Sequence, residues 1–290
     1  MKDLQEIENA IGKLRDSLEE ISSGRRDLDR ALKARGLRVH TKDPHAELLL
    51  PPDAPQKDWD TLYEHLKRYS FRLFLRDAIA KRHGFALEDL LKYCSREAAQ
   101  RYLETLLELK AIVKEGGTYT LRNPLLHSFG PTLEWFIAEL FRRELDSPAY
   151  YGVRLYGTPH GGDFDVIALW QGYLVYTEVK SSPPRGVERE EIRAFLLRLA
   201  GLIPDCAILF NDTHLRMADK IVPFLEEELS LLSSPSPLER LTGELFHTGH
   251  RLFVINSKKS VLENFLYCLR DFLSHTVPRP WPSPTDEERD

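Results

Sequence analysis

The clearest indication of the fold is the segment GGDFDVIALWQGYLVYTEVKSS, residues 161–182. Two apolar runs, residues 164–170 and 173–179, flank Gln171-Gly172, a break of the length that closes a tight turn. The pattern predicts a β-hairpin. The first run is apolar at every position from 166 to 170, which is typical of a strand covered on both faces.

Charged residues lie at the open end of this hairpin. A symmetric turn places Asp165 opposite Glu178, where Cβ atoms are about 4.5–5.5 Å apart and like charges destabilise a sheet. The same register places Lys180 opposite Asp163, on the face that carries Glu178. A divalent metal would turn this repulsion into attraction, and the lysine could deprotonate or orient an attacking water. The alternative is an ordinary surface hairpin with alternating charges.

The motif Asp165 followed by Glu178-Val179-Lys180 resembles the active-site signature of the PD-(D/E)XK, or restriction-endonuclease-like, nuclease superfamily. Residues 162–168 and 175–180 are similar to its Holliday-junction-resolvase and Mrr-like branches. The resemblance implies metal-dependent hydrolysis of phosphodiester bonds with Mg²⁺, or with Mn²⁺ in vitro. Asp165, Glu178 and the carbonyl of Val179 would be ligands, and Lys180 would position the attacking water.

A glutamate on the preceding helix matches a further position of this family. Gly130-Pro131 starts a predicted helix that runs to about residue 145, because proline is tolerated in the first turn. Glu134 shares the apolar face of this helix, and the resemblance makes it a metal ligand and catalytic residue. The alternative is that Glu134 borders the apolar stripe and reaches solvent. Glu139 lies on a different face and is expected in solvent.

Composition limits the class of protein. The chain has 290 residues, enough for two domains, and a formal net charge of −5, so contact with DNA must come from local patches. Three separated cysteines fit reduced thiols. No apolar run approaches the 18–20 residues or so that span a bilayer, and no signal core opens the chain. We therefore expect a cytoplasmic protein without membrane contact.

Residues 1–36 are expected to form one helix with a heptad seam, followed by a proline-rich linker over residues 37–56. The seam is narrow and flanked by charges, which favours a coiled coil and a homodimer. The alternative is that the stripe docks on later parts of the same chain. The seam consists of Leu4, Ile7, Ile11, Leu14, Leu18, Ile21, Leu28 and Leu32.

Residues 57–122 are expected to form a winged helix-turn-helix domain, which the order helix, turn, helix and two-stranded wing resembles. Ser95 would cap the second helix, residues 96–110, and Gly116-Gly117 would close the wing. The alternative is a protein-interaction or dimerisation module. In the DNA-binding version of this fold, four residues would contact DNA: Arg96, Gln100, Arg101 and Lys114.

Residues 123–277 are expected to form the nuclease-like domain, and residues 278–290 a disordered tail. The domain would have a restriction-endonuclease-like α/β fold: a mixed sheet with an αβββαβ core plus an appended αβα unit. His247 and His250 precede a strand with no carboxylate beside them, so they are not expected to be ligands. A basic stripe could bind phosphates or form ion pairs in solvent, and it comprises Arg185, Arg189 and Arg193.

These features together predict a Mg²⁺-dependent endonuclease acting on DNA. Two alternatives stay open. One is a catalytically silent nucleic-acid-binding regulator or assembly factor on a nuclease fold, and the other is a nuclease for RNA or branched junctions.

Overall fold

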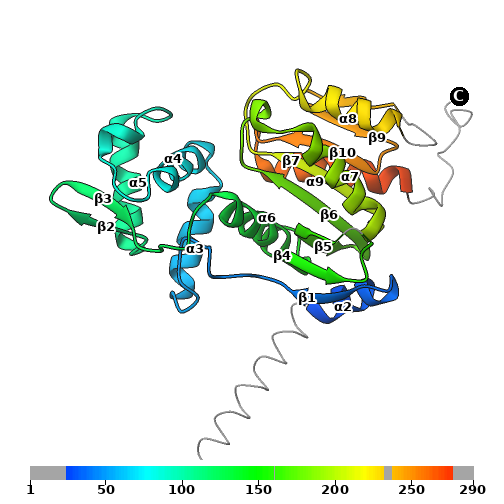
Figure 1. Ribbon diagram of the computed structural model, residues 1–290, viewed down its shortest axis with the longest axis horizontal. Helices are drawn as coiled ribbons and strands as arrows, with labels where there is room; N and C mark the ends of the chain where they lie inside the picture. Colours follow the sequence, from blue (N-terminus) through cyan, green and yellow to red (C-terminus); the bar gives the residue numbers. More distant parts are fainter. Residues whose placement is uncertain (1–23, 160, 232–236, 277–290) are drawn as a thin grey trace, which may run out of the picture.

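The structure, a computed structural model, describes residues 24–159, 161–231 and 237–276. Its centre is an eight-stranded sheet with the strand order β1-β4-β5-β6-β7-β10-β9-β8 (Figure 1). The strands are β1 (Arg38–Thr41), β4 (Ala149–Tyr156), β5 (Asp163–Trp170), β6 (Tyr173–Lys180), β7 (Cys206–Asn211), β8 (Glu239–Thr242), β9 (Leu245–Thr248) and β10 (Leu252–Asn256). Only the β6–β7 and β7–β10 pairs are parallel. The predicted α/β class with a mixed sheet is confirmed.

The β5–β6 hairpin has the predicted turn and register. Gln171 and Gly172 both have positive φ angles, 50° and 81°, as a two-residue hairpin turn with the twist of its strands requires. The ladder runs from Trp170↔Tyr173 to Val166↔Thr177. The hairpin therefore lies at the middle of the sheet, between β4 and β7.

Helices cover both faces of the sheet and make a three-layer molecule (Figure 1). Helices α6 (Gly130–Glu144) and α9 (Val261–Thr276) pack on one face, where Phe141 and Phe210 both contact Phe265. The other face is covered by α2 (Arg25–Ala34), α7 (Arg189–Leu202) and α8 (Ile221–Ser230). A 3-10 turn, η2 (Pro184–Gly186), leads from β6 into α7.

The order α6, β4, β5, β6, α7, β7 matches the expected core, and α8, β10 and α9 match the expected addition. The antiparallel β8–β9 hairpin was not predicted. Its strands are four residues long and its sequence lacks a long apolar run, so the periodicity was too short to detect.

The preceding unit contains α3 (Gln56–Leu66), α4 (Tyr69–Ala80), a 3-10 turn η1 (Leu87–Leu90), α5 (Arg96–Glu108), β2 (Ile112–Glu115) and β3 (Thr118–Leu121). The Ser95 hydroxyl caps α5 by accepting a hydrogen bond from the amide of Ala98, as predicted. The helix expected before that cap is only the 3-10 turn η1. We call residues 56–121 the helical unit.

The helical unit shares one hydrophobic core with the α6 face of the sheet. A buried ion pair also joins them, because Arg72 of α4 forms hydrogen bonds to both oxygens of Asp212, which directly follows β7. Both side chains are at most 3% exposed. Tyr69 stacks on His214, with ring centroids 3.6 Å apart. On the same helix, Arg76 donates a hydrogen bond to the carbonyl of Ser181.

Two expectations for the N-terminal part need correction. Leu28 and Leu32 do not continue a seam for a second chain, because they lie fully buried against this chain's own sheet, in the cluster that contains Tyr150 and Val153. The segment 37–56 is not simply a linker, because β1 pairs with β4 and Leu48–Leu50 are buried. The earlier seam residues lie outside the described part of the chain.

The predicted tail, residues 278–290, also lies outside the described residues. Among the helices that the structure describes, none is both long and apolar enough to cross a bilayer.

Candidate active site

Asp165 lies where the two strands of the hairpin leave their ladder. It was expected directly opposite Glu178, but the ladder ends one pair earlier, at Val166↔Thr177. The Asp165 carboxylate instead accepts a hydrogen bond of 2.7 Å from the amide of Val179. This contact holds the Asp165 side chain beside β6. A hydrogen bond to the side chain thus takes the place of a backbone hydrogen bond of the ladder.

Glu178 is the most enclosed acid of the group, only 1% exposed. Its carboxylate accepts hydrogen bonds from Arg198 of α7 at 2.6 Å and from the hydroxyl of Tyr176. Lys180 contributes an ion pair at 3.0 Å. Two cations therefore already neutralise Glu178, which the motif alone did not indicate.

Asp163 lies at the margin of this group, although the register from the sequence placed it on the same face, and its charge adds to the rise in the pKa of Glu134 that burial and Glu178 cause. It is 58% exposed and pairs with Arg154 of β4 at 2.6 Å. The reason is the β4–β5 ladder, which sets Arg154 directly opposite Asp163.

Glu134 reaches the site from α6. The charge of Glu178 acts on its carboxylate, which agrees with the predicted position near Asp165 and Glu178. Burial and then the charge of Glu178 raise the pKa of Glu134 to about 8. Burial raises the pKa of Asp165 well above its usual range, and the charges of Glu178 and Glu134 add to this. Within the described residues, no hydrogen bond or ion pair reaches the Glu134 carboxylate.

Gly152 makes room for Glu134. A Cβ atom at this strand position would lie 2.7 Å from Pro44 and 3.8 Å from an oxygen of Glu134, and the backbone there has a positive φ of 53°. Both the close approach and the backbone conformation require glycine.

Lys180 is held as a cation. Burial acts to lower its pKa, but the charges of Glu178 and Glu191 outweigh it, so its pKa is raised. The amine lies 3.0 Å from Glu178 and 2.9 Å from Glu191. A protonated amine can orient a water or stabilise negative charge, but it cannot take a proton from the water.

The acids fit a divalent metal with oxygen ligands. Buried carboxylates that raise one another's pKa lack positive charge, and a hard cation would supply it. Asp165 and Glu134 fit best, since neither has a cationic partner among the described residues. The three carboxylates do not form a tight group within 4.8 Å, so binding would require small side-chain movements.

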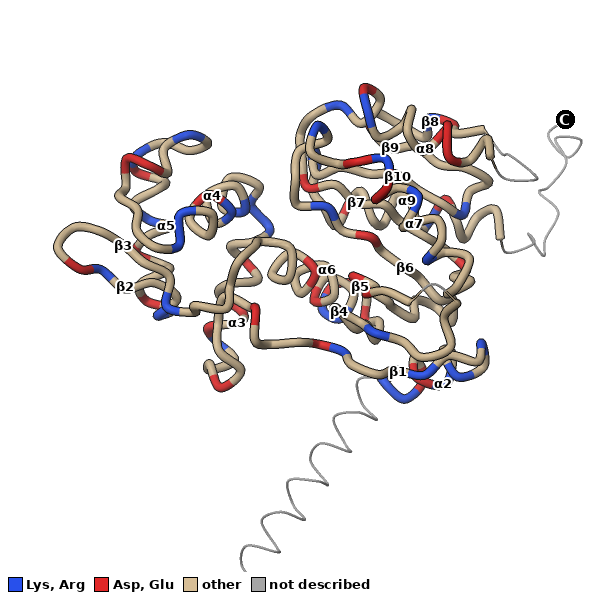
Figure 2. Tube along the Cα trace, in the orientation of Figure 1, with Lys and Arg blue, Asp and Glu red and all other residues tan. Residues whose placement is uncertain are grey.

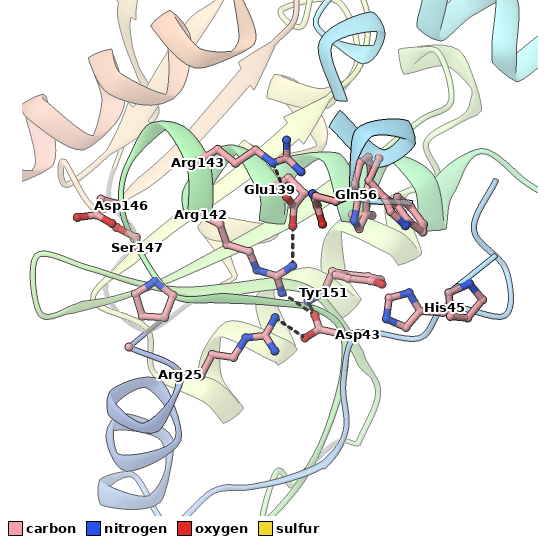
Figure 3. A pocket seen from close by; sticks show the side chains of 15 residues that line it. Arg25, Asp43, His45, Gln56, Glu139, Arg142, Arg143, Asp146, Ser147 and Tyr151 are labelled. Atoms are coloured by element: carbon pink, nitrogen blue, oxygen red, sulfur yellow. Dashed lines mark hydrogen bonds and ion pairs between the residues drawn. The ribbon is translucent and has the colours of Figure 1, made fainter. Parts of the chain in front are cut away.

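A polar cavity of about 650 Å³ borders α6 and β4 next to this site (Figure 3). In it, Arg142 of α6 bridges Glu139 at 2.8 Å and Asp43 at 2.9 Å. Asp43 in turn accepts a hydrogen bond from the amide of Tyr151 on β4. These contacts fasten α6 to the edge of β4 and so position Glu134. Glu139, expected in solvent, is only 13% exposed.

The residues predicted to bind nucleic acid are largely engaged within the chain. Arg189 and Arg193 both pair with Glu228 of α8, at 2.6 and 3.0 Å, whereas the Arg185 side chain has no ion pair among the described contacts. Arg96 pairs with Glu88, and Gln100 bonds to Glu104. Arg101 lies beside a small surface hollow, and Lys114 lies over the ring of Tyr119. Basic and acidic residues are interspersed over both units (Figure 2).

Sequence reasoning missed Arg198, Tyr176 and Glu191. A signal existed, because Glu191 and Arg198 lie seven residues apart on one face of α7, flanking the buried Phe195. Tyr176 shares its strand face with Glu178 and Lys180, as alternate strand residues do. Only the fold shows that α7 crosses β6 at this point.

No protein-family model and no curated protein matches the sequence. Among solved structures, the chain is similar to protein VC1899 from Vibrio cholerae, with a TM-score of 0.52, 17% sequence identity, and coverage of 84% of this chain and 62% of that chain. It is also similar to Can2 from Sulfobacillus thermosulfidooxidans, solved in complex with cyclic tetra-adenylate, with a TM-score of 0.41, 14% identity, and coverage of 63% and 51%.

The likeness to VC1899 concerns the fold alone, and that to Can2 is too slight to support an argument. The chain spans about three fifths of the length of VC1899. The mixed sheet with helices on both faces is consistent with a restriction-endonuclease-like fold.

The pKa of Glu134 gives a first testable prediction. Folding favours the protonated acid, so its stabilising effect is present below pH 4.5 or so and is lost as the pH rises through about 8. Without divalent metal, Glu134→Gln should therefore become more stable than the parent by roughly 1–3 kcal/mol at pH 9, but not at pH 4.

Urea unfolding at pH 4, 6, 8 and 9 measures this difference. Glu263→Gln on the exposed first turn of α9 is the matched control and should follow the parent at every pH. Equal pH dependence of Glu134→Gln and the parent would show that Glu134 titrates normally.

Proposed function

We propose that the chain is a metal-dependent nuclease that hydrolyses phosphodiester bonds in DNA. The observation that carries this proposal is the convergence of Glu134, Asp165 and Glu178 from three elements, where burial and then the charge of Glu178 raise the pKa of the other two. Glu134 and Asp165 have no ion-pair partner among the described residues, and enclosing acidic groups without counter-charges is costly in a purely structural role. The restriction-endonuclease-like arrangement of the sheet supports the same reading.

A bound Mg²⁺ or Mn²⁺ ion would polarise the scissile phosphate and lower the pKa of a bound water. Asp165 and Glu134 would hold it, together with Glu178 and the carbonyl of Val179. Lys180, kept protonated by its two acidic neighbours, would donate a hydrogen bond to the attacking water and stabilise the charge that develops on the phosphate.

We further propose that the helical unit is a winged helix-turn-helix that docks DNA, and that the seam residues before Arg25, which lie outside the described residues, join two chains in a homodimer. The order of α4, η1 and α5 and the β2–β3 wing supports the first part. Arg96 and Gln100 would have to exchange their internal acidic partners for DNA, which makes docking dependent on salt.

One observation favours a second function. Arg198 occupies Glu178, and such an internal cation can stand in place of a metal. The chain would then be a catalytically silent, nucleic-acid-binding regulator on a nuclease fold.

The test is cleavage by the full-length chain of linear, nicked and branched duplex DNA, single-stranded DNA and RNA, each with Mg²⁺, Mn²⁺ or EDTA. Cleavage of DNA with metal and none with EDTA is the expected result. Cleavage confined to RNA or branched junctions would show that these, and not linear DNA, are the substrate. Binding without cleavage of any substrate would favour the catalytically silent regulator.

The arginines of α7 provide a separate prediction for substrate binding. Glu228→Gln removes the acid that Arg189 and Arg193 share and leaves Arg189 its pair with Glu227, so it should free Arg193 above all and tighten nucleic-acid binding. The double variant Arg189→Ala/Arg193→Ala should weaken binding and reduce the slope of log K against log salt by about 2. Fluorescence anisotropy with labelled duplex at several salt concentrations measures both effects.

Arg270→Ala, an exposed arginine of α9, is the control for loss of positive charge. If Arg270→Ala weakens binding as much as each of the two α7 substitutions does, the effect of the double variant reflects only lost positive charge. Arg189 and Arg193 would then serve only as ion-pair partners of Glu228.

A further inference from the structure

A second group of potential metal ligands lies far from the acids of the hairpin. His250, Asp271 and His275 each offer one ligand atom, and these atoms all lie within 4.8 Å of one another, the only such group of three among the described residues. His250 Nδ1 is 2.7 Å from Asp271 Oδ2, and His275 Nδ1 is 3.6 Å from Asp271 Oδ1. Two imidazoles therefore lie beside one carboxylate. His275 Nδ1 is also 2.8 Å from the Asp271 backbone carbonyl and 3.1 Å from Ser274 Oγ, contacts that it would give up to bind a metal through this atom.

The fold brings these residues together from distant segments. His250 lies in the turn between β9 and β10, whereas Asp271 and His275 lie one helical turn apart near the end of α9. His250 was not expected to be a ligand, because no carboxylate stands beside it in the chain. Packing of α9 along β10 provides the missing carboxylate.

The rings of two of these residues are stacked. His250 and His275 are nearly parallel, with centroids 3.5 Å apart and an angle of 10°. Neutral imidazole nitrogens and an ionised carboxylate oxygen are ligands that one divalent ion can share.

His247 supports the arrangement from the buried side. Its ring stacks on His250 at 4.1 Å, and its Nδ1 atom accepts a hydrogen bond from the His250 amide. His250 is thus oriented before any ligand arrives. The group is also open to solvent, since His275 is 47% and His250 32% exposed, so an ion can enter without local unfolding.

We propose that His250, Asp271 and His275 bind a divalent transition-metal ion, with Zn²⁺ as the best match. Two imidazole nitrogens and one carboxylate oxygen are a donor set that Zn²⁺ takes, with water completing four-fold coordination. Ligand atoms around tetrahedral Zn²⁺ lie about 3.3 Å apart, so closing this group from 4.8 Å takes only side-chain rotation.

The site is separate from the acids of the hairpin. Lys180, Asn211 and Asn256 are level with one another at the carboxyl end of the parallel strands β6, β7 and β10. His250 precedes β10 and lies at the opposite end of the sheet. An ion there fastens the end of α9 to the β9–β10 turn and does not touch the acids of the hairpin.

The test is a titration of the metal-free, full-length Asp165→Asn variant with Zn²⁺, followed by calorimetry, and with Co²⁺, followed by visible absorption. This background weakens competing binding at the hairpin. We expect one Zn²⁺ per chain at the histidine site, a rise in Tm, and the visible bands of Co²⁺ bound by nitrogen and oxygen. Asp271→Asn in this background retains the side-chain volume and should weaken Zn²⁺ at least 10-fold.

His250→Ala/His275→Ala should weaken Zn²⁺ by 100-fold or more and abolish the Co²⁺ bands. The matched control His83→Ala/His127→Ala removes two exposed histidines elsewhere and should change neither result. Failure of the parent to bind Zn²⁺, or equal binding by the two double variants, would overturn the proposal. Nuclease activity enters none of these measurements, so the outcome is independent of the proposed function.

Discussion

Asp165→Asn should abolish metal-dependent cleavage and, in the absence of metal, leave the protein at least as stable as the parent. The loss should be about 10³-fold or more, because a missing metal ligand removes several kcal/mol of transition-state stabilisation. Stability should not fall, because ionised Asp165 is disfavoured by burial and by the charges of Glu178 and Glu134. The asparagine oxygen can still accept the hydrogen bond from the Val179 amide.

Asp163→Asn is the matched control, since it makes the same change two residues away on the same strand. The structure places Asp163 in an exposed pair with Arg154, so this variant should retain nearly full activity. Cleavage rates and Tm values of both variants, each with and without Mg²⁺, decide the matter. If both variants lost activity equally, Asp163 as well as Asp165 would be needed for metal binding. That result would contradict the exposed position of Asp163 in the structure.

Arg72→Ala should cause the largest loss of stability in the chain, about 3–5 kcal/mol. The guanidinium is 1% exposed and forms hydrogen bonds to both oxygens of Asp212 and to the carbonyl of Leu66. Its removal would leave the Asp212 carboxylate buried without a counter-charge, which is why the cost exceeds that of an exposed ion pair.

Chemical denaturation of Arg72→Ala, Arg72→Lys and Arg76→Ala measures this effect. Lysine keeps the charge but not the planar fork, so it should recover only part of the stability. Arg76→Ala removes a single, partly buried hydrogen bond and should cost about 1 kcal/mol. A loss below 1 kcal/mol in Arg72→Ala would show that the two units hold together without this pair.

The parts of the site that follow from local rules could be predicted from the sequence. The Gln171-Gly172 turn sets the hairpin register, and the alternation of side chains along β6 places Glu178 and Lys180 on one face. Helix periodicity brought Glu134 toward the same end of the sheet. Each of these inferences needs only the geometry of one or two neighbouring elements.

The rest depends on packing between distant segments. Arg198 reaches Glu178 because α7 crosses β6, and Arg72 reaches Asp212 across 140 residues of chain. The ladder of the hairpin ends before Asp165 because the Asp165 carboxylate accepts a hydrogen bond from the Val179 amide. A hydrogen bond from backbone to side chain leaves no trace in the periodicity of the sequence. The seam residues Leu28 and Leu32 could serve either a partner or the chain's own sheet, and only tertiary structure distinguishes these uses.

The contact between Arg76 and Ser181 has a thermodynamic consequence. Ser181 directly follows Lys180, so α4, which is fastened to the sheet by Arg72, contacts the chain next to the candidate site. If a ligand on the helical unit favours one position of α4, it changes the affinity of the acids for metal. Linkage then requires that metal change the affinity of the helical unit for that ligand by the same factor. Binding of the metal and binding of that ligand form a closed thermodynamic cycle of four equilibria. Measuring three of the four binding free energies therefore determines the fourth.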